Sequence, residues 1–113
     1  MRIIIAVLLS VSIQSWASEA ITGNDLMAWA PAFKSVQNQS NDDPANLAQS
    51  AEITNYITAV SDKLVSSGAA CFPDATTSSQ IVTAVIMFLE RHPQRWDEDG
   101  QVLVTSSLKA YRC

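Results

Sequence analysis

The two cysteines of this chain are the feature that most constrains its fold. Cys71 lies inside the chain, Cys113 is its last residue, and both follow what reads as a cleavable export signal. Export places a protein where thiols oxidise. Since two cysteines allow only one intramolecular pairing, we predict a disulfide between them. In the chain-entropy model, closing this loop stabilises the fold by about 4 kcal/mol. The alternative is two free thiols, one of them a nucleophile.

The predicted signal peptide spans residues 1–17. Arg2 precedes a short apolar run, and Ser15-Trp16-Ala17 supplies the small residues that a signal peptidase inspects, so we expect cleavage after Ala17. The run is too short to span a bilayer. A retained amphipathic anchor is the alternative, but the segment lacks the charged face of such a helix. We therefore expect residues 18–113 to form one domain, free of the membrane after cleavage.

The charge balance excludes some classes of partner. The chain has 11 acidic and 7 basic residues, a formal net charge of −4, and loss of Arg2 makes it more negative still. Nucleic-acid binding and adhesion to anionic lipid are therefore disfavoured. A partner with a basic surface would suit such a chain better.

Four segments have helical character, and no window alternates long enough to predict a sheet, which indicates an all-α fold. The first helix should begin near Asn24, with Pro31 tolerable only in its first turns. A polar loop spans residues 37–43. Asp43 should cap a second helix that begins at Pro44 and ends at Gly68. Its predicted buried stripe is Leu47, Ile53, Tyr56, Ile57, Val60 and Leu64.

Two further helices complete the predicted bundle. Thr77 and Gln80 form a capping box at the start of the third helix, and Pro93 stops it. An acidic cluster at residues 97–99 complements the dipole of a fourth helix, expected from about Gly100 to Tyr111. The predicted architecture is a small bundle of about four helices, stapled by the disulfide between Cys71 and Cys113.

Residues suited to catalysis or metal binding are scarce. The one histidine, His92, lies in the last turn of a predicted helix. We interpret it as a cap at the negative end of the helix dipole rather than as a general base. The run at residues 97–100 fails as a calcium loop, because Arg95 and Ser106 would occupy its first and last ligand positions. No spacing resembles a zinc site. We expect no catalytic residue, metal or cofactor.

The link between the third and fourth helices, Gln94-Arg95-Trp96-Asp97-Glu98, is the candidate for a binding function. Function is often carried by loops, and Trp and Arg are the residue types that most often anchor protein interfaces. The alternative is that Trp96 folds back and covers the core below the loop.

The chain resembles the Rap/Tai family of small periplasmic immunity proteins, which neutralise peptidoglycan amidase effectors delivered by type VI secretion. The order and spacing of several short motifs carry the resemblance over nearly all of the chain after the signal. These motifs are Gly23-Asn24-Asp25-Leu26, Tyr56-Ile57 with Val60 and Asp62, Cys71-Phe72-Pro73, Thr77 with Gln80, Phe88-Leu89, His92-Pro93, Leu103-Val104, Leu108 and Cys113.

The chain departs from many relatives of that family at two positions. Those relatives have a second pair of cysteines, where this chain has Ala30 and Ile53. Both members of the pair are absent together, so no orphan thiol remains, and an apolar contact could replace the bridge. We expect the first helix to be held less firmly as a result.

The resemblance implies stoichiometric inhibition without catalysis. The protein would reside in the periplasm of a Gram-negative bacterium and block the active-site cleft of a cysteine-dependent peptidoglycan amidase effector. The resemblance also makes a homodimer plausible. The predicted partner-binding residues are Arg91, Gln94, Arg95, Trp96, Asp97 and Glu98. Two other functions share the sequence features: a periplasmic acid-stress chaperone, and an adaptor of an envelope complex. A chaperone should bind hydrophobic dye sharply between about pH 2 and 3, as its carboxylates protonate.

Overall fold

The computed structural model describes residues 20–38 and 43–113, and in this part of the chain it confirms the all-α prediction. The α-helices are α2 (Gly23–Gln37), α3 (Pro44–Ser66), α4 (Ser78–Arg91) and α5 (Gly100–Ser107). Two 3₁₀ turns follow α4 and α5: η1 (Pro93–Arg95) and η2 (Lys109–Tyr111). The predicted signal peptide, residues 1–17, lies outside the described residues, as does most of the predicted loop 37–43.

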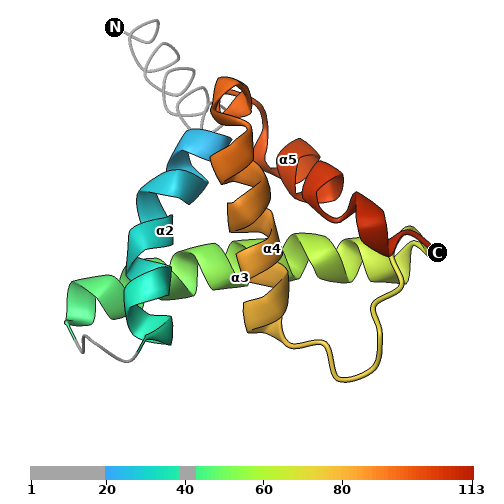
Figure 1. The fold of residues 1–113 in the computed structure, drawn as a ribbon, viewed down its shortest axis with the longest axis horizontal. Helices are drawn as coiled ribbons and strands as arrows, with labels where there is room; N and C mark the ends of the chain where they lie inside the picture. Colours follow the sequence, from blue (N-terminus) through green and yellow to red (C-terminus); the bar gives the residue numbers. More distant parts are fainter. Residues whose placement is uncertain (1–19, 39–42) are drawn as a thin grey trace, which may run out of the picture.

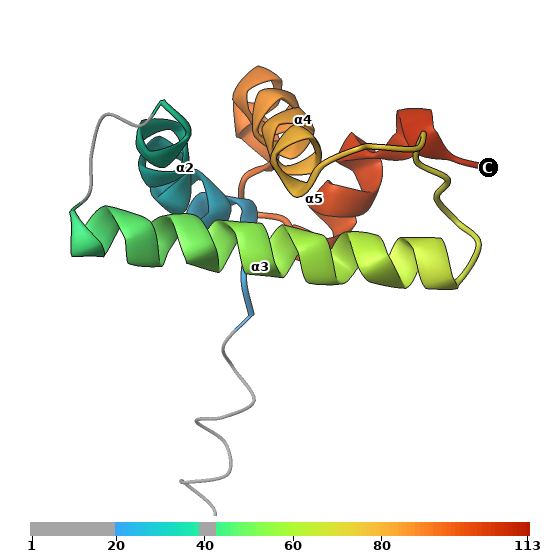
Figure 2. The same cartoon turned by 90° about the horizontal axis from the view of Figure 1, so that it is seen from below.

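The helices form two layers. The long helix α3 forms one layer, and α2, α4 and α5 pack side by side on one of its faces (Figures 1 and 2). Apolar side chains from all four helices meet between the layers. The buried core comprises Leu26, Ala30, Phe33, Ile53, Ile57, Val60, Val82, Val85, Ile86, Leu89, Leu103, Val104 and Leu108.

Local capping signals explain where the helices begin. The Thr77 N–H donates to Gln80 Oε1 at 2.9 Å, and the Gln80 N–H donates to Thr77 Oγ1 at 3.2 Å, which confirms the capping box of α4. Asp43 accepts from the N–H of Ala45 at 3.4 Å, so the predicted cap of α3 is also present. Each contact satisfies a backbone N–H that the helix itself leaves without an acceptor.

Three details of the predicted helices are wrong. Leu47 is 47% exposed, because it lies in the first turn of α3 and the first buried residue of that helix is Ser50. The last helix ends at Ser107, and the chain continues to Tyr111 as the tighter turn η2. Pro31 lies well inside α2, beyond the first turns. It offers no N–H to the Met27 carbonyl, yet α2 continues because its face is buried against the core.

The predicted disulfide is confirmed. It joins Cys71, in the connection between α3 and α4, to Cys113, with their Cα atoms 5.1 Å apart. The two segments also meet through the Cys71 N–H, which donates to the Tyr111 carbonyl at 2.7 Å, and through the rings of Phe72 and Tyr111, whose centroids are 4.9 Å apart. The hydrogen bond and the disulfide together tie the last turn to the connection between α3 and α4.

Ala30 and Ile53 both lie in the core, with 1% and 0% of their surface exposed. Apolar packing therefore occupies the positions that the resemblance assigns to a second bridge. That α2 is held less firmly than in relatives with the bridge stays a prediction.

Candidate functional site

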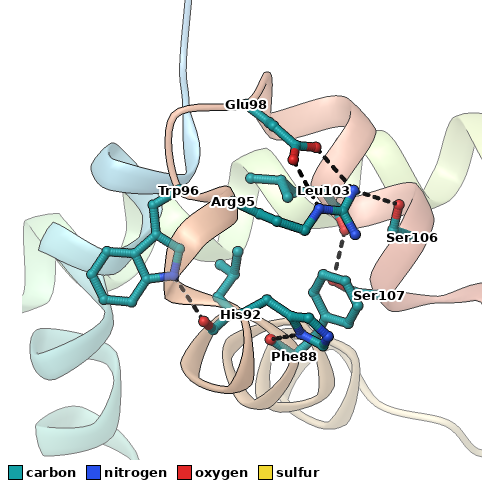
Figure 3. A network of polar contacts seen from close by, with 9 residues as sticks. Phe88, His92, Arg95, Trp96, Glu98, Leu103, Ser106 and Ser107 are labelled. Carbon is teal, nitrogen blue, oxygen red and sulfur yellow. Dashed lines mark hydrogen bonds and ion pairs between the residues drawn. The ribbon is translucent and has the colours of Figure 1, made fainter.

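The six predicted partner-binding residues lie in one compact corner, which we define as residues 91–99. It runs from the end of α4 through η1 to the start of α5, beside the N-terminal end of α2 (Figure 1). Four short helix ends or turns meet there, so the corner is fixed by contacts in several directions. Figure 3 shows the polar contacts that hold it.

Arg95 is fastened inside the corner. Its Nε and Nη2 donate to the two carboxylate oxygens of Glu98, each at 2.9 Å. The guanidinium carbon lies 5.5 Å from the ring centroid of Phe88, and Nη2 reaches Ser106 Oγ on α5 at 3.4 Å (Figure 3). The hydrogen bond from Arg95 lowers the pKa of Glu98 and raises that of Arg95 itself. The bidentate contact fixes the orientation of the guanidinium and also pairs its charge with a carboxylate.

Trp96 takes the second of the two roles considered from the sequence. Its indole N–H donates to the Leu89 carbonyl at 2.8 Å, and the ring packs against the core (Figure 3). The Leu89 carbonyl lies in the last turn of α4, where helical N–H donors run out. The side chain therefore covers the core and anchors the corner to α4, while part of its surface stays exposed.

His92 caps α4 at the same place. Its Nδ1 lies 2.8 Å from the Phe88 carbonyl, and its ring stacks on that of Phe88 with centroids 4.3 Å apart. A carbonyl can only accept, so Nδ1 carries the hydrogen in this contact. Imidazole and Arg95 thus pack on the same aromatic ring, and His92 has a structural position at the helix end.

Backbone hydrogen bonds tie the corner to the start of α2. The Asn24 N–H donates to the Trp96 carbonyl at 2.9 Å, and the Gly23 N–H donates to the Glu98 carbonyl at 3.2 Å. On the other side, the Gly100 N–H donates to the Ile21 carbonyl at 2.8 Å. The Asn24 side-chain amide also donates to Asp97 Oδ1 at 3.0 Å. The two segments form a short antiparallel contact, with a bridge between Thr22 and Asp99.

This close approach depends on two glycines that the sequence reasoning did not single out. A Cβ on Gly23 would lie 2.8 Å from Trp96 Cα, and one on Gly100 would lie 2.6 Å from the Tyr56 hydroxyl. Real Cβ atoms essentially never come so near, so a side chain at Gly23 would push the Trp96 backbone away, and one at Gly100 would displace the side chain of Tyr56. Gly100 directly follows the corner in the sequence, whereas no local pattern links Gly23 to it.

The residues of the corner differ in what they offer to a partner. Arg91, Gln94 and Asp97 are exposed, and these three have room for contacts with another molecule. Arg95 and Glu98 keep 30% and 41% of their side-chain surface exposed, although they are bonded to each other. The corner therefore presents both signs of charge on a backbone that is fixed in advance.

Within residues 20–38 and 43–113, no group of three or more His, Cys, Asp or Glu side chains is placed to hold a metal ion. The helices of the same ranges include none long and apolar enough to cross a membrane.

Comparison with known proteins finds one family. A family model described as Rap1a immunity proteins matches residues 22–113. No match is found among the curated proteins or among the solved structures. The family match covers both cysteines, all four helices of the described chain and the whole corner.

Proposed function

This chain belongs to the Rap1a immunity protein family, and we propose that it is a periplasmic immunity protein that binds and occludes a peptidoglycan amidase effector of type VI secretion. It protects the cell from its own or a sister cell's toxin. The observation that carries the proposal is the family match over residues 22–113. The predicted signal peptide supports export, and the amidase comes from the resemblance of the motifs described above.

The corner supports the proposal because an inhibitor gains affinity from being rigid before it binds. Ordering a loop on binding costs about 0.5–1.5 kcal/mol for each immobilised flexible side chain. Here the corner is already held by the Arg95–Glu98 pair, by the indole of Trp96 and by the backbone bonds to Gly23 and Asn24. Binding of the effector therefore requires little further loss of conformational entropy in the corner.

We assign the effector contact to the exposed residues Arg91, Gln94 and Asp97, flanked by Arg95, Trp96 and Glu98. Charged residues at an interface rim mainly raise the rate of encounter with a complementary surface. The net charge of −4 favours an effector whose surface around the cleft is basic. No catalytic step by this chain is part of the proposal, which requires only that the corner obstruct the cleft.

The direct test is inhibition. The mature protein and a candidate amidase effector from the same bacterium are purified, and hydrolysis of peptidoglycan peptides is followed as inhibitor is added. With the oxidised protein, we expect the rate of hydrolysis to fall to baseline at an integral molar ratio of inhibitor to amidase. Excess substrate should not change that ratio. An amidase that keeps full activity with excess inhibitor would refute the proposed function.

Variants of the exposed residues test the corner separately from the fold. Arg91→Glu combined with Gln94→Ala should weaken effector binding at least tenfold while leaving the urea unfolding curve unchanged. Lys63→Glu is the matched control, because it makes the same charge reversal on an exposed residue of α3 outside the corner. Equal binding by both variants would refute the corner as the contact surface, while the inhibition result would still stand. Trp96→Ala is less informative, since Trp96 also covers the core.

Two parts of the proposal have their own measurements. Fractionation of the native host should recover the protein in the periplasm, and sequencing of its N-terminus should begin at Ser18. Sedimentation of the purified protein tests the homodimer that the family resemblance implies.

A further inference from the structure

A second surface feature lies outside the corner, although Ser106 at its edge accepts a hydrogen bond from Arg95. A cavity of about 220 Å³ opens between the end of α3 and the α5–η2 segment. Its apolar part is formed by Leu64, Ala70 and Leu108, and the last two are almost fully buried. Lys109 and Arg112 line its other side.

The charge of this cavity is opposite to that of the chain as a whole. The net charge of the chain is −4, yet the two ionisable residues that line the cavity are both cations. The ion pairs found in the described part of the chain are Lys34–Glu90 and Arg95–Glu98, so Lys109 and Arg112 have no carboxylate partner there. Both cations are exposed and available to an anion from another molecule.

The size of the cavity narrows the class of ligand. Sites for drug-sized molecules and cofactors usually enclose about 300–1,000 Å³, which is more than this cavity holds. It has room for one apolar side chain together with neighbouring groups of a peptide. An apolar group in the cavity with carboxylates beside it would satisfy both the apolar surface and the two cations.

The disulfide holds the two walls of the cavity together. Ala70 on one wall immediately precedes Cys71, and Arg112 on the other immediately precedes Cys113. Figure 1 shows the end of α3 beside the C-terminus of the chain. The cavity is thus formed by two segments that are covalently joined, which keeps its shape fixed before any ligand binds.

We propose that this cavity is a docking site for an acidic peptide segment of a protein partner. One apolar side chain enters between Leu64 and Leu108, and carboxylates on either side of it pair with Lys109 and Arg112. The inference goes beyond the proposed function, since it requires neither an amidase nor the corner.

The test uses a fluorescein-labelled peptide in which one leucine lies between aspartates. Fluorescence anisotropy with the mature, oxidised protein should show saturable binding. Lys109→Glu combined with Arg112→Glu should weaken it at least tenfold. The control is Lys34→Glu combined with Lys63→Glu, which makes the same change of charge at exposed residues outside both the cavity and the corner and should leave the affinity within twofold.

Further arms separate the apolar contact from the charge. Replacing the leucine of the peptide by glycine, or its aspartates by asparagines, should each weaken binding at least tenfold. Thr105→Phe puts a larger side chain on the exposed lining of the cavity and should also weaken binding, with the helical circular dichroism unchanged. The variant with Cys71→Ser and Cys113→Ser should bind more weakly at temperatures where it remains folded.

Several results would overturn the proposal. They are the absence of saturable binding at millimolar peptide, an equal loss of affinity in the control variant, and undiminished binding of the glycine peptide. Binding of anionic lipid vesicles that depends on Lys109 and Arg112, without binding of the peptide, would also overturn it in favour of a membrane contact. None of these results bears on amidase inhibition, so the two proposals fail independently.

Discussion

Replacement of Gly23 by alanine should destabilise the protein by about 3 kcal/mol, although alanine is normally the better helix former. The added Cβ would lie 2.7 Å from Leu103 Cδ1, 2.8 Å from Trp96 Cα and 2.9 Å from the Trp96 carbonyl oxygen. The methyl group of Leu103 can shift. The Trp96 backbone cannot shift without disturbing the bonds between the corner and α2.

The magnitude follows from three terms. Overpacking in a tight site costs about 1–3 kcal/mol. The bonds from the Gly23 N–H to the Glu98 carbonyl and from the Asn24 N–H to the Trp96 carbonyl would be stretched, at a net cost of about 1 kcal/mol each. Alanine returns about 1 kcal/mol through its helix propensity. The balance is a loss of about 3 kcal/mol, a large share of the 5–15 kcal/mol that typically stabilises a domain.

Urea unfolding followed by tryptophan fluorescence measures this loss, and Trp96 reports directly on the corner. The control is Gly68→Ala, because Gly68 has φ of +80° but nothing within 4 Å of the added Cβ. Gly68→Ala should cost only about 1–2 kcal/mol, which is the energy of placing a residue with a Cβ in the left-handed region. A Gly23→Ala protein as stable as the parent, or one that loses no more than Gly68→Ala, would refute the close-approach argument.

Three other perturbations have definite expected outcomes. The variant with Cys71→Ser and Cys113→Ser should lose about 4 kcal/mol in urea unfolding, and a loss below 1 kcal/mol would show that the bridge contributes little. The hydrogen bond from Arg95 lowers the pKa of Glu98 below its ordinary 4.5. The ionised Glu98 therefore stabilises the fold above pH 4.5, and this stabilisation is lost as pH falls through the lower pKa of the folded state. Glu98→Gln should therefore reduce the loss of stability on acidification; unchanged pH profiles would contradict this. Burial, and secondly the nearby Asp99 carboxylate, raise the pKa of Tyr56 above 10.0. The neutral phenol therefore contributes fully to the stability of the fold below pH 10.0, and this contribution is lost as pH rises through the higher folded pKa. Tyr56→Phe should flatten the alkaline side of the stability profile, and a phenol that titrates normally in absorbance would argue against the shift.

Features that depend on neighbouring residues could be predicted from the sequence. The capping box of Thr77 and Gln80 is encoded within four residues, and the structure has it. The stop at Pro93 is equally local, because proline restricts the residue before it. The pairing of the cysteines follows from there being only two. These signals need no knowledge of which helix packs on which.

Features that depend on the tertiary arrangement could not be read in the same way. Leu47 fits the apolar stripe of α3, yet no packed layer reaches the first turns of that helix, so periodicity alone misplaced it. The orientation of Trp96 depends on its hydrogen bond to the Leu89 carbonyl, which also accepts the His92 N–H, and on space beside α4. The contact of Gly23 and Asn24 with the corner joins segments at opposite ends of the chain, and no local pattern announces it.

That end-to-end contact has a consequence for how the protein comes into being. Asn24 and Asp97, which are joined by a side-chain hydrogen bond, are 73 positions apart in the sequence. Contacts of such long range form only after the intervening chain is available, and they slow folding because a large loop must close first. The first turn of α2 therefore finds its partners only when the segment around Asp97 is available to pack against it. In an exported chain, this contact forms only after both segments have crossed the membrane.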